Sequence, residues 1–321
     1  MVNNMTTNPM NGGSDRRKVV SGRKPGIQMT SPTTSTTSTT STTVRACDPI
    51  DTRMTTVRYS THPDIDARFT SMDIHPSPTV GDDCSPPPVV MWVHGGAWTG
   101  GDKGNPETLD KADYVHRLGA TLIAVNYRLA NRYGRGFWPD YANDLAYALA
   151  FVTSHADELN VDPTRIVLLG HSAGGQIVSV VATDPSYLAA RDLDPSTIDC
   201  VIANDTEGYR LDDAATATRE YVENAFGSDP AVLAQASPAV QVEVNGAPGA
   251  RFLVITRGSD RRRAVATEFA DLVNSAGGTA QLLDAGDLSH AEVNRVLGSS
   301  ADPVVTPAVT DFVTGCLGAV G

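Results

Sequence analysis

The sequence predicts an α/β fold with a mainly parallel sheet and helices on both faces. Short apolar runs that suit buried strands alternate along the chain with longer segments of helical spacing. One of these runs, 166–169, leads into the pattern Gly170-x-Ser172-x-Gly174, which is typical of a strand, a tight turn and a helix in succession. Such alternation normally gives parallel strands joined by helical crossovers.

The expected elements follow one another from residue 47. The expected strands are 55–59, 67–74, 89–93, 121–126, 166–169, 199–203, 252–256 and 281–284. The expected helices are one that ends near Leu118, then 141–159, 219–226, 265–276 and 302–317. The polar segment 205–245 is expected to form a small cap over the site.

Composition divides the 321-residue chain in two. Residues 1–46 carry six basic residues and one acid, a net charge of +5, and 30–43 contains only Ser and Thr apart from Pro32. Such a segment buries too little apolar surface to offset its chain entropy, so we expect it to be disordered and 47–321 to form the folded domain. The folded domain carries a charge of -17, which argues against nucleic acid as a partner. No apolar stretch is long enough to span a membrane.

Compartment and cysteine chemistry are linked. No apolar signal region follows Met1, so a cytoplasmic location is expected, with secretion as the alternative if the true N-terminus lies upstream. The four cysteines are Cys47, Cys84, Cys200 and Cys316. They form no C-x-x-C pair and have no histidine at zinc-ligand spacing, so no metal is expected. Cys47 and Cys84 bracket the first expected strands and would pair in an oxidising compartment; four reduced thiols are the alternative.

Ser172 is the candidate nucleophile. A serine at a sharp strand-to-helix turn exposes its hydroxyl, and the flanking glycines let strand and helix approach each other. The amide of Ala173 then lies at a helix N-terminus, where it can face a developing oxyanion. Serine needs a base, and only His290 of the seven histidines follows Ser172. If the chain order is nucleophile, acid, base, then His290 is the base.

Four aspartates are candidates for the acid that orients this base. Asp260 is preferred, because it lies in the loop after the strand 252–256, at the carboxyl end of the sheet. Its alternative role is to cap the helix that follows, and Arg261–Arg263 could pair with it instead. The other three candidates are Asp205, Asp284 and Asp287.

A glycine-containing loop, 94–98 (HGGAW), directly follows another buried strand. Glycines let backbone amides turn toward a substrate oxygen. Gly95 and Gly96 are therefore expected to form an oxyanion hole together with the amide that follows the serine; a simple turn is the alternative. His94 is expected to brace this loop, and Trp98 to wall the acyl pocket.

These motifs resemble the α/β-hydrolase superfamily and, within it, carboxylesterases and kynurenine formamidase-like proteins. The resemblance extends over roughly residues 50–318 and rests on 94–98 with 100–103 (GGDK), 126–129 (NYRL), 162–166 (DPTRI), 170–175 (GHSAGG) and 289–292 (SHAE). Hormone-sensitive-lipase-like proteins carry a third glycine where Ala97 stands, so the resemblance favours the formamidase-like and small-esterase group.

The expected function is hydrolysis of small carboxylic esters through an acyl-enzyme on Ser172, with no cofactor. Hydrolysis of a small amide such as N-formylkynurenine is the second expectation, because it uses the same residues. A non-catalytic binding protein of this fold is an alternative of another class, and a complete Ser/His/Asp set argues against it. An acyltransferase is a further alternative, which product analysis with an added alcohol separates from a hydrolase.

Overall fold

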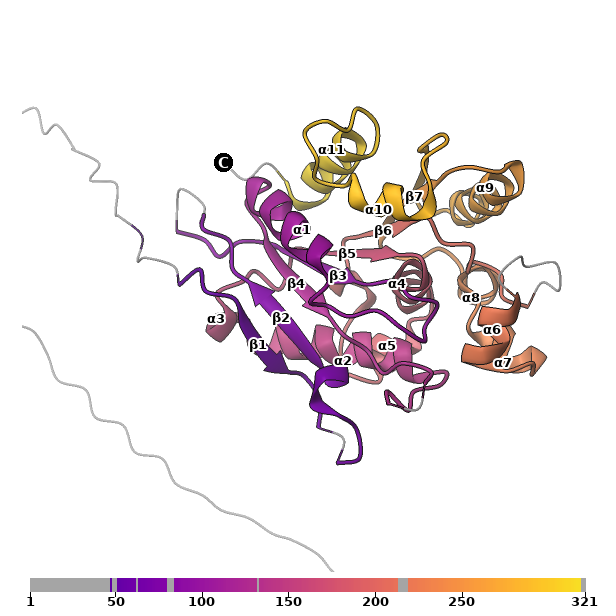
Figure 1. Ribbon diagram of the computed structural model, residues 1–321, viewed down its shortest axis with the longest axis horizontal. Helices are drawn as coiled ribbons and strands as arrows, with labels where there is room; N and C mark the ends of the chain where they lie inside the picture. The colour runs from indigo at the N-terminus through magenta and orange to yellow at the C-terminus, as the bar shows by residue number, and fades with distance from the viewer. Residues whose placement is uncertain are drawn as a thin grey trace, which may run out of the picture. The chain divides into compact units, whose positions relative to one another are not determined.

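The computed structural model describes residues 47, 51–61, 63–79, 84–131, 133–212 and 219–318 (Figure 1). The chain divides between residues 46 and 47 into two units, and the second unit holds all the described elements. The expected disorder of 1–46 lies outside the described residues.

One sheet of eight strands organises the folded unit. The strands are β1 (Thr55–Arg58), β2 (Ser71–His75), β3 (Val89–Val93), β4 (Thr121–Val125), β5 (Ile166–His171), β6 (Cys200–Asn204), β7 (Arg251–Thr256) and β8 (Ala280–Asp284). Their order in the sheet is β1-β2-β4-β3-β5-β6-β7-β8. β2 pairs antiparallel with β1 and with β4, and all other pairs are parallel. The expected mainly parallel sheet is confirmed.

Helices connect these strands. They are α1 (Pro106–Arg117), α2 (Asp140–Ser154), α3 (Ala156–Leu159), α4 (Ala173–Thr183), α5 (Ser186–Ala189), α6 (Arg219–Phe226), α7 (Pro230–Gln235), α8 (Pro238–Asn245), α9 (Asp260–Ser275), α10 (His290–Arg295) and α11 (Val305–Leu317). Two 3-10 helices, η1 (Ala67–Thr70) and η2 (Pro195–Thr197), complete the described elements.

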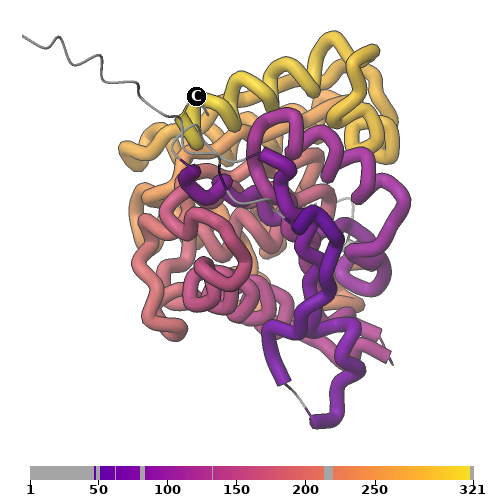
Figure 2. The backbone as a smooth tube through the Cα atoms, turned by 90° about the vertical axis from the view of Figure 1, so that its left-hand side faces the viewer, coloured from indigo at the N-terminus to yellow at the C-terminus, as the bar shows by residue number. Residues whose placement is uncertain are grey.

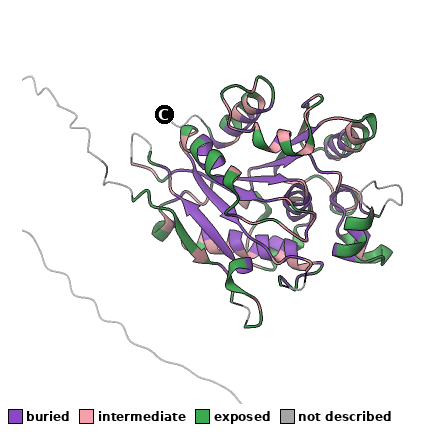
Figure 3. Cartoon of the chain, viewed as in Figure 1, coloured by how far each residue is buried: buried purple, intermediate pink, exposed green. Residues whose placement is uncertain are grey.

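The two faces of the sheet bury two separate apolar clusters. Val89 and Met91 of β3 point into one cluster with residues of α2, α4 and α9, whereas Val90 and Trp92 point into the other with residues of α1 and α11. In Figure 1, α1 and α11 lie on the opposite side of the sheet from α2. Figure 2 shows α11 running along one edge of the folded unit, and Figure 3 shows the central strands buried while β1 and the outer helix surfaces are exposed. This arrangement has the helices on both faces that the alternating pattern predicted.

Three expected elements differ in kind or extent from the prediction, and α5, α7, α8 and α10 were not predicted. The expected strand 67–74 begins only at Ser71, because Asp66 caps a 3-10 turn by accepting a hydrogen bond from the amide of Arg68. The expected helix 141–159 is broken at His155 into α2 and α3. The expected helix 265–276 starts five residues earlier as α9, because Ser259 caps its N-terminus.

Two disulfides join the four cysteines. Cys47 pairs with Cys84, one of the two alternatives that the sequence left open. Cys200 at the start of β6 pairs with Cys316 in α11, which fastens the last helix to the central sheet. The alternative of four reduced thiols is therefore not what the structure holds.

Candidate active site

Ser172 lies at the tight turn between β5 and α4. Its φ of 56° and ψ of -119° place it in a backbone region that residues with a side chain rarely adopt. A Cβ on Gly170 would lie 2.2 Å from the carbonyl oxygen of Gly174, and one on Gly174 would lie 2.1 Å from that of Val93. The amide of Ser172 donates to the carbonyl of Asn204 on neighbouring β6 at 2.9 Å. The strand, turn and helix expected around Ser172 are therefore present, and the two glycines are required by close packing.

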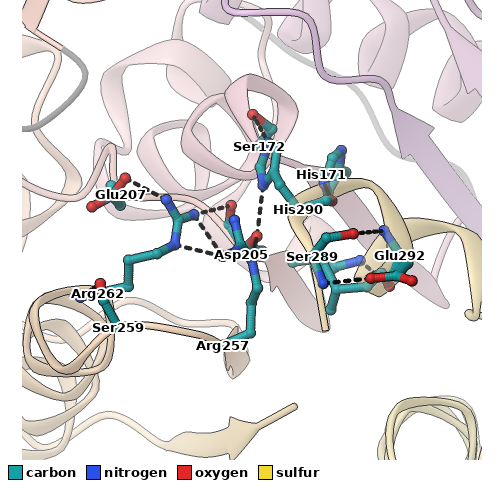
Figure 4. A network of polar contacts seen from close by, with 12 residues as sticks. His171, Ser172, Asp205, Glu207, Arg257, Ser259, Arg262, Ser289, His290 and Glu292 are labelled. Carbon is teal, nitrogen blue, oxygen red and sulfur yellow. Dashed lines mark hydrogen bonds and ion pairs between the residues drawn. The ribbon is translucent and has the colours of Figure 1, made fainter. Parts of the chain in front are cut away.

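His290 lies within hydrogen-bond distance of Ser172, as Figure 4 shows: the distance from its Nε2 to Ser172 Oγ is 2.9 Å. His290 begins α10, and a capping box between Ser289 and Glu292 fixes this turn. The ring of His171 lies 4.5 Å from that of His290, and its Nε2 donates to the backbone oxygen of His290 at 3.0 Å. Burial lowers the pKa of His171 to about 3, so this second ring is neutral.

The acid that contacts His290 is Asp205 and not Asp260. Asp205 directly follows β6, with a φ of 51°, and its amide donates to Ile255 on β7 at 2.8 Å. His290 Nδ1 donates to Asp205 Oδ2 at 2.6 Å, and Asp205 is 1% exposed. The structure thus brings together Ser172, His290 and Asp205, which was one of the three alternatives to Asp260.

Asp260 lies away from His290 because α9 begins at Asp260 and not at residue 265, as the sequence predicted. It is the first residue of that helix, its side chain is fully exposed, and it pairs with Arg263 at 3.7 Å. A carboxylate in the first turn interacts favourably with the helix dipole, which is close to the capping role considered as the alternative. Of the remaining candidates, Asp284 pairs with Arg263 at 2.7 Å and Asp287 is exposed.

Positive charges surround the carboxylate of Asp205. Arg257 donates to Oδ2 at 2.6 Å, and Arg262 donates to Oδ1 at 2.6 Å and also pairs with Glu207. Burial on its own would raise the pKa of Asp205. The hydrogen bond from His290 and the charges of Arg262 and Arg257 outweigh burial and hold that pKa below its usual value. Asp205 is therefore ionised wherever His290 can act as a base.

The loop between β3 and α1 lines the same site. Gly96 has a φ of +125°, and a Cβ there would lie 2.2 Å from a backbone oxygen, so only glycine fits. Within the described residues, the amides of Gly95 and Gly96 donate to no backbone acceptor and so remain available. The His94 ring stacks on Tyr127 at 4.6 Å, and the Tyr127 hydroxyl donates to the backbone oxygen of His94 at 3.1 Å. These contacts support the bracing role expected for His94.

A cavity of about 670 Å³ opens over these groups. Its lining includes Gly95, Gly96, Ser172, Ala173 and His290. Trp98 also lines it and is held by a hydrogen bond from its Nε1 to Gln176 at 2.9 Å, while Phe226 of α6 packs edge-on against its ring. Tyr221 of α6 lines the cavity as well, so part of the segment 205–245 borders the site.

His171, Asp205 and His290 also place three potential metal-ligand atoms within 4.8 Å of one another. The Asp205 oxygens, however, already accept from His290 and from two guanidinium groups. A cation there would have to displace these donors and face two positive charges. The donor set fits proton transfer better than metal binding.

The arginines at Asp205 were missed in the sequence analysis as parts of the site. Arg262 belongs to the run 261–263, which was noted only as a competitor for Asp260, and Arg257 carried no signal. The sequence did offer a clue to the acid, because Asp205 directly follows one buried strand, whereas Asp260 comes a few residues after the next one.

The BD-FAE family model matches residues 72–261. The carboxylesterase NlhH of Mycobacterium tuberculosis is 30% identical over 232 residues, which cover 65% of this chain and 68% of NlhH. The probable carboxylic ester hydrolase LipM of the same species is 39% identical over 100 residues, which cover 31% of this chain but only 22% of LipM.

A similar solved structure is esterase 2 of the planctomycete Thermogutta terrifontis. Its form phosphonylated by sarin superposes with a TM-score of 0.65 at 18% identity and covers 81% of this chain and 94% of that one. Its propionate-bound form gives a TM-score of 0.63 at 19% identity, covering 83% and 94% of the two chains. At this identity the likeness establishes the fold.

Proposed function

The chain belongs to the BD-FAE family and has the α/β-hydrolase fold of carboxylic ester hydrolases, and on that premise we propose that it cleaves small esters through an acyl-enzyme on Ser172. The observation that carries the proposal is the continuous set of hydrogen bonds from Ser172 Oγ through His290 to the buried Asp205. This set joins a nucleophile, a base and an orienting acid.

Each residue then has a defined part in the reaction. Nε2 of His290 takes the proton of Ser172 as Oγ attacks the ester carbonyl, and Asp205 stabilises the resulting imidazolium. The amides of Gly95, Gly96 and Ala173 stabilise the oxyanion. The alcohol leaves with the proton from Nε2, and a water activated by the same nitrogen releases the acid.

Oxyanion stabilisation supplies a large part of the expected rate enhancement. Removing one such donor typically costs about 3 kcal/mol in the barrier. Two of the donors, the amides of Gly95 and Gly96, come from a tightly packed loop. A Cβ on Gly96 would overlap backbone atoms, and one on Gly95 would press against His171 and Ser172. The third donor, the amide of Ala173, begins α4. The strained turn at Ser172 keeps the hydroxyl at this point before substrate binds.

Ester hydrolysis is favoured over formamide hydrolysis by the relatives. NlhH and LipM are named as a carboxylesterase and a carboxylic ester hydrolase. The propionate in the structural neighbour and the wall formed by Trp98 support a short acyl group in the substrate. A small-molecule ester is the corresponding partner, and the cavity lining by Tyr221 supports a capping role for the described part of segment 205–245.

Labelling with a fluorophosphonate tests the nucleophile. Intact-mass measurement should show one adduct on the parent protein and none on Ser172→Ala, because only an activated serine reacts readily with this reagent. A panel of esters of increasing acyl length, with N-formylkynurenine beside it, then ranks the substrate classes. Absence of an adduct on well-folded parent protein would refute the proposal.

The structure also bears on the compartment. Two disulfides among the described cysteines favour an oxidising environment, which was the alternative to the expected cytoplasmic location. Among the helices of the described residues, none has the length and apolar character needed to cross a bilayer.

A further inference from the structure

Arg257 and Arg262 reach the carboxylate of Asp205 from two different elements. Arg257 directly follows β7, and Arg262 lies in the first turn of α9 (Figure 4). Both side chains are 17% exposed, and that of Asp205 is 1% exposed. A single buried carboxylate thus faces two guanidinium groups in addition to the imidazole of His290.

The two arginines bind different oxygens. Arg257 Nε donates to Oδ2 at 2.6 Å, and this is the oxygen that also accepts from His290 Nδ1 at 2.6 Å. Arg262 donates to Oδ1 from Nη2 at 2.6 Å and from Nε at 3.1 Å, and its Nη2 also reaches the backbone oxygen of Asp205 at 3.2 Å. Rotation of the carboxylate about its last bond would break both sets of contacts at once.

These contacts exceed what orientation of one imidazole requires. One ionised carboxylate is enough to hold the tautomer and stabilise the imidazolium. The arginines instead occupy both carboxylate oxygens of Asp205, so they hold the plane of the carboxylate in the orientation that receives Nδ1 of His290.

We propose that Arg257 and Arg262 are positioning residues that fix the carboxylate of Asp205 against His290 for ester hydrolysis. The inference rests on the proposed function, since the reaction that it concerns is the hydrolysis of esters by Ser172.

Arg257→Gln is the first test. Misplacement of Asp205 should lower kcat for a neutral ester between about 10-fold and 100-fold and leave KM nearly unchanged. Arg257→Lys keeps a cationic donor and should recover part of the lost kcat. Arg263→Gln is the matched control, because Arg263 pairs instead with the exposed Asp284.

Arg262 needs a paired change. Replacing it alone would leave Glu207, which is 6% exposed, as an unpaired acid next to Asp205. Glu207→Gln together with Arg262→Gln removes both charges, and kcat should still fall because Oδ1 of Asp205 loses the donors of Arg262. Thermal unfolding of every variant identifies loss of fold.

A proton NMR measurement separates failure of this inference from failure of the proposed function. The Nδ1 proton between His290 and Asp205 should give a strongly downfield resonance in the parent, and Arg257→Gln should shift or broaden it whether or not an ester is cleaved. If the parent is inactive but this shift is seen, the proposed function fails and the arginine contact stands. If Arg257→Gln folds and keeps both the resonance and the kcat of the parent, or if Arg263→Gln changes them equally, the inference is overturned.

Discussion

Asp205→Asn compared with Asp260→Asn decides which aspartate orients the base. Asparagine has the shape of aspartate, so the first change keeps the packing but removes the charge that His290, Arg257 and Arg262 share. It also presents an amide that can donate toward Nδ1 and so stabilise the wrong tautomer of His290. The second change alters a side chain that is fully exposed and pairs with Arg263 at 3.7 Å.

The expected losses of activity and of stability are large for Asp205→Asn and negligible for Asp260→Asn. Loss of the acid from a Ser-His-Asp set costs about 10⁴-fold in kcat, on the order of 5 kcal/mol in the barrier. Two arginines left beside a neutral amide should also destabilise the fold by about 3 kcal/mol. Asp260→Asn should leave both quantities unchanged, because exposed charge pairs of this kind contribute little.

Initial rates with a short-chain ester, measured with thermal unfolding on the same samples, give both quantities. KM should change little, because Asp205 lies behind His290 as seen from Ser172. The assignment would be refuted if Asp260→Asn lost activity as Asp205→Asn does. It would also be refuted if a well-folded Asp205→Asn kept a tenth or more of the parent rate.

Two further changes test the rest of the fold. Cys200→Ser combined with Cys316→Ser removes a disulfide that closes a loop of 116 residues. The free energy of unfolding should fall by about 4 to 5 kcal/mol, which is measured as a lower Tm. An unchanged Tm in non-reducing buffer would show that this disulfide does not form. Burial lowers the pKa of Lys111 to about 8, so the unfolded chain binds more protons between about pH 8 and pH 10.5 and stability rises with pH in that window. Lys111→Met should therefore raise the free energy of unfolding in urea by about 2 kcal/mol at pH 7 and by less near pH 10. Equal effects at both pH values would contradict this reasoning.

Most of the fold was predictable from local patterns. Apolar runs such as 89–93 and 166–169 are buried along their whole length, so their composition alone identifies them as central strands. The elbow at Ser172 was predictable because the glycines around it have no room for a side chain. The start of α9 was not, since Ser259 becomes a cap only once the backbone has turned after β7.

The acid was harder to predict because two neighbouring strands end at the same level. β6 and β7 are parallel and in register, with Asn204 opposite Ile255, so the residues that follow them reach the same edge of the sheet. A carboxylate after either strand could meet His290, and the sequence order of nucleophile, acid and base holds for both. The choice depends on the side chains that leave β7: Arg257 turns toward the site and Asp260 turns outward with α9. Asp205 is thus distinguished from Asp260 by its neighbours in space, because two arginines and His290 contact its carboxylate while Asp260 is exposed.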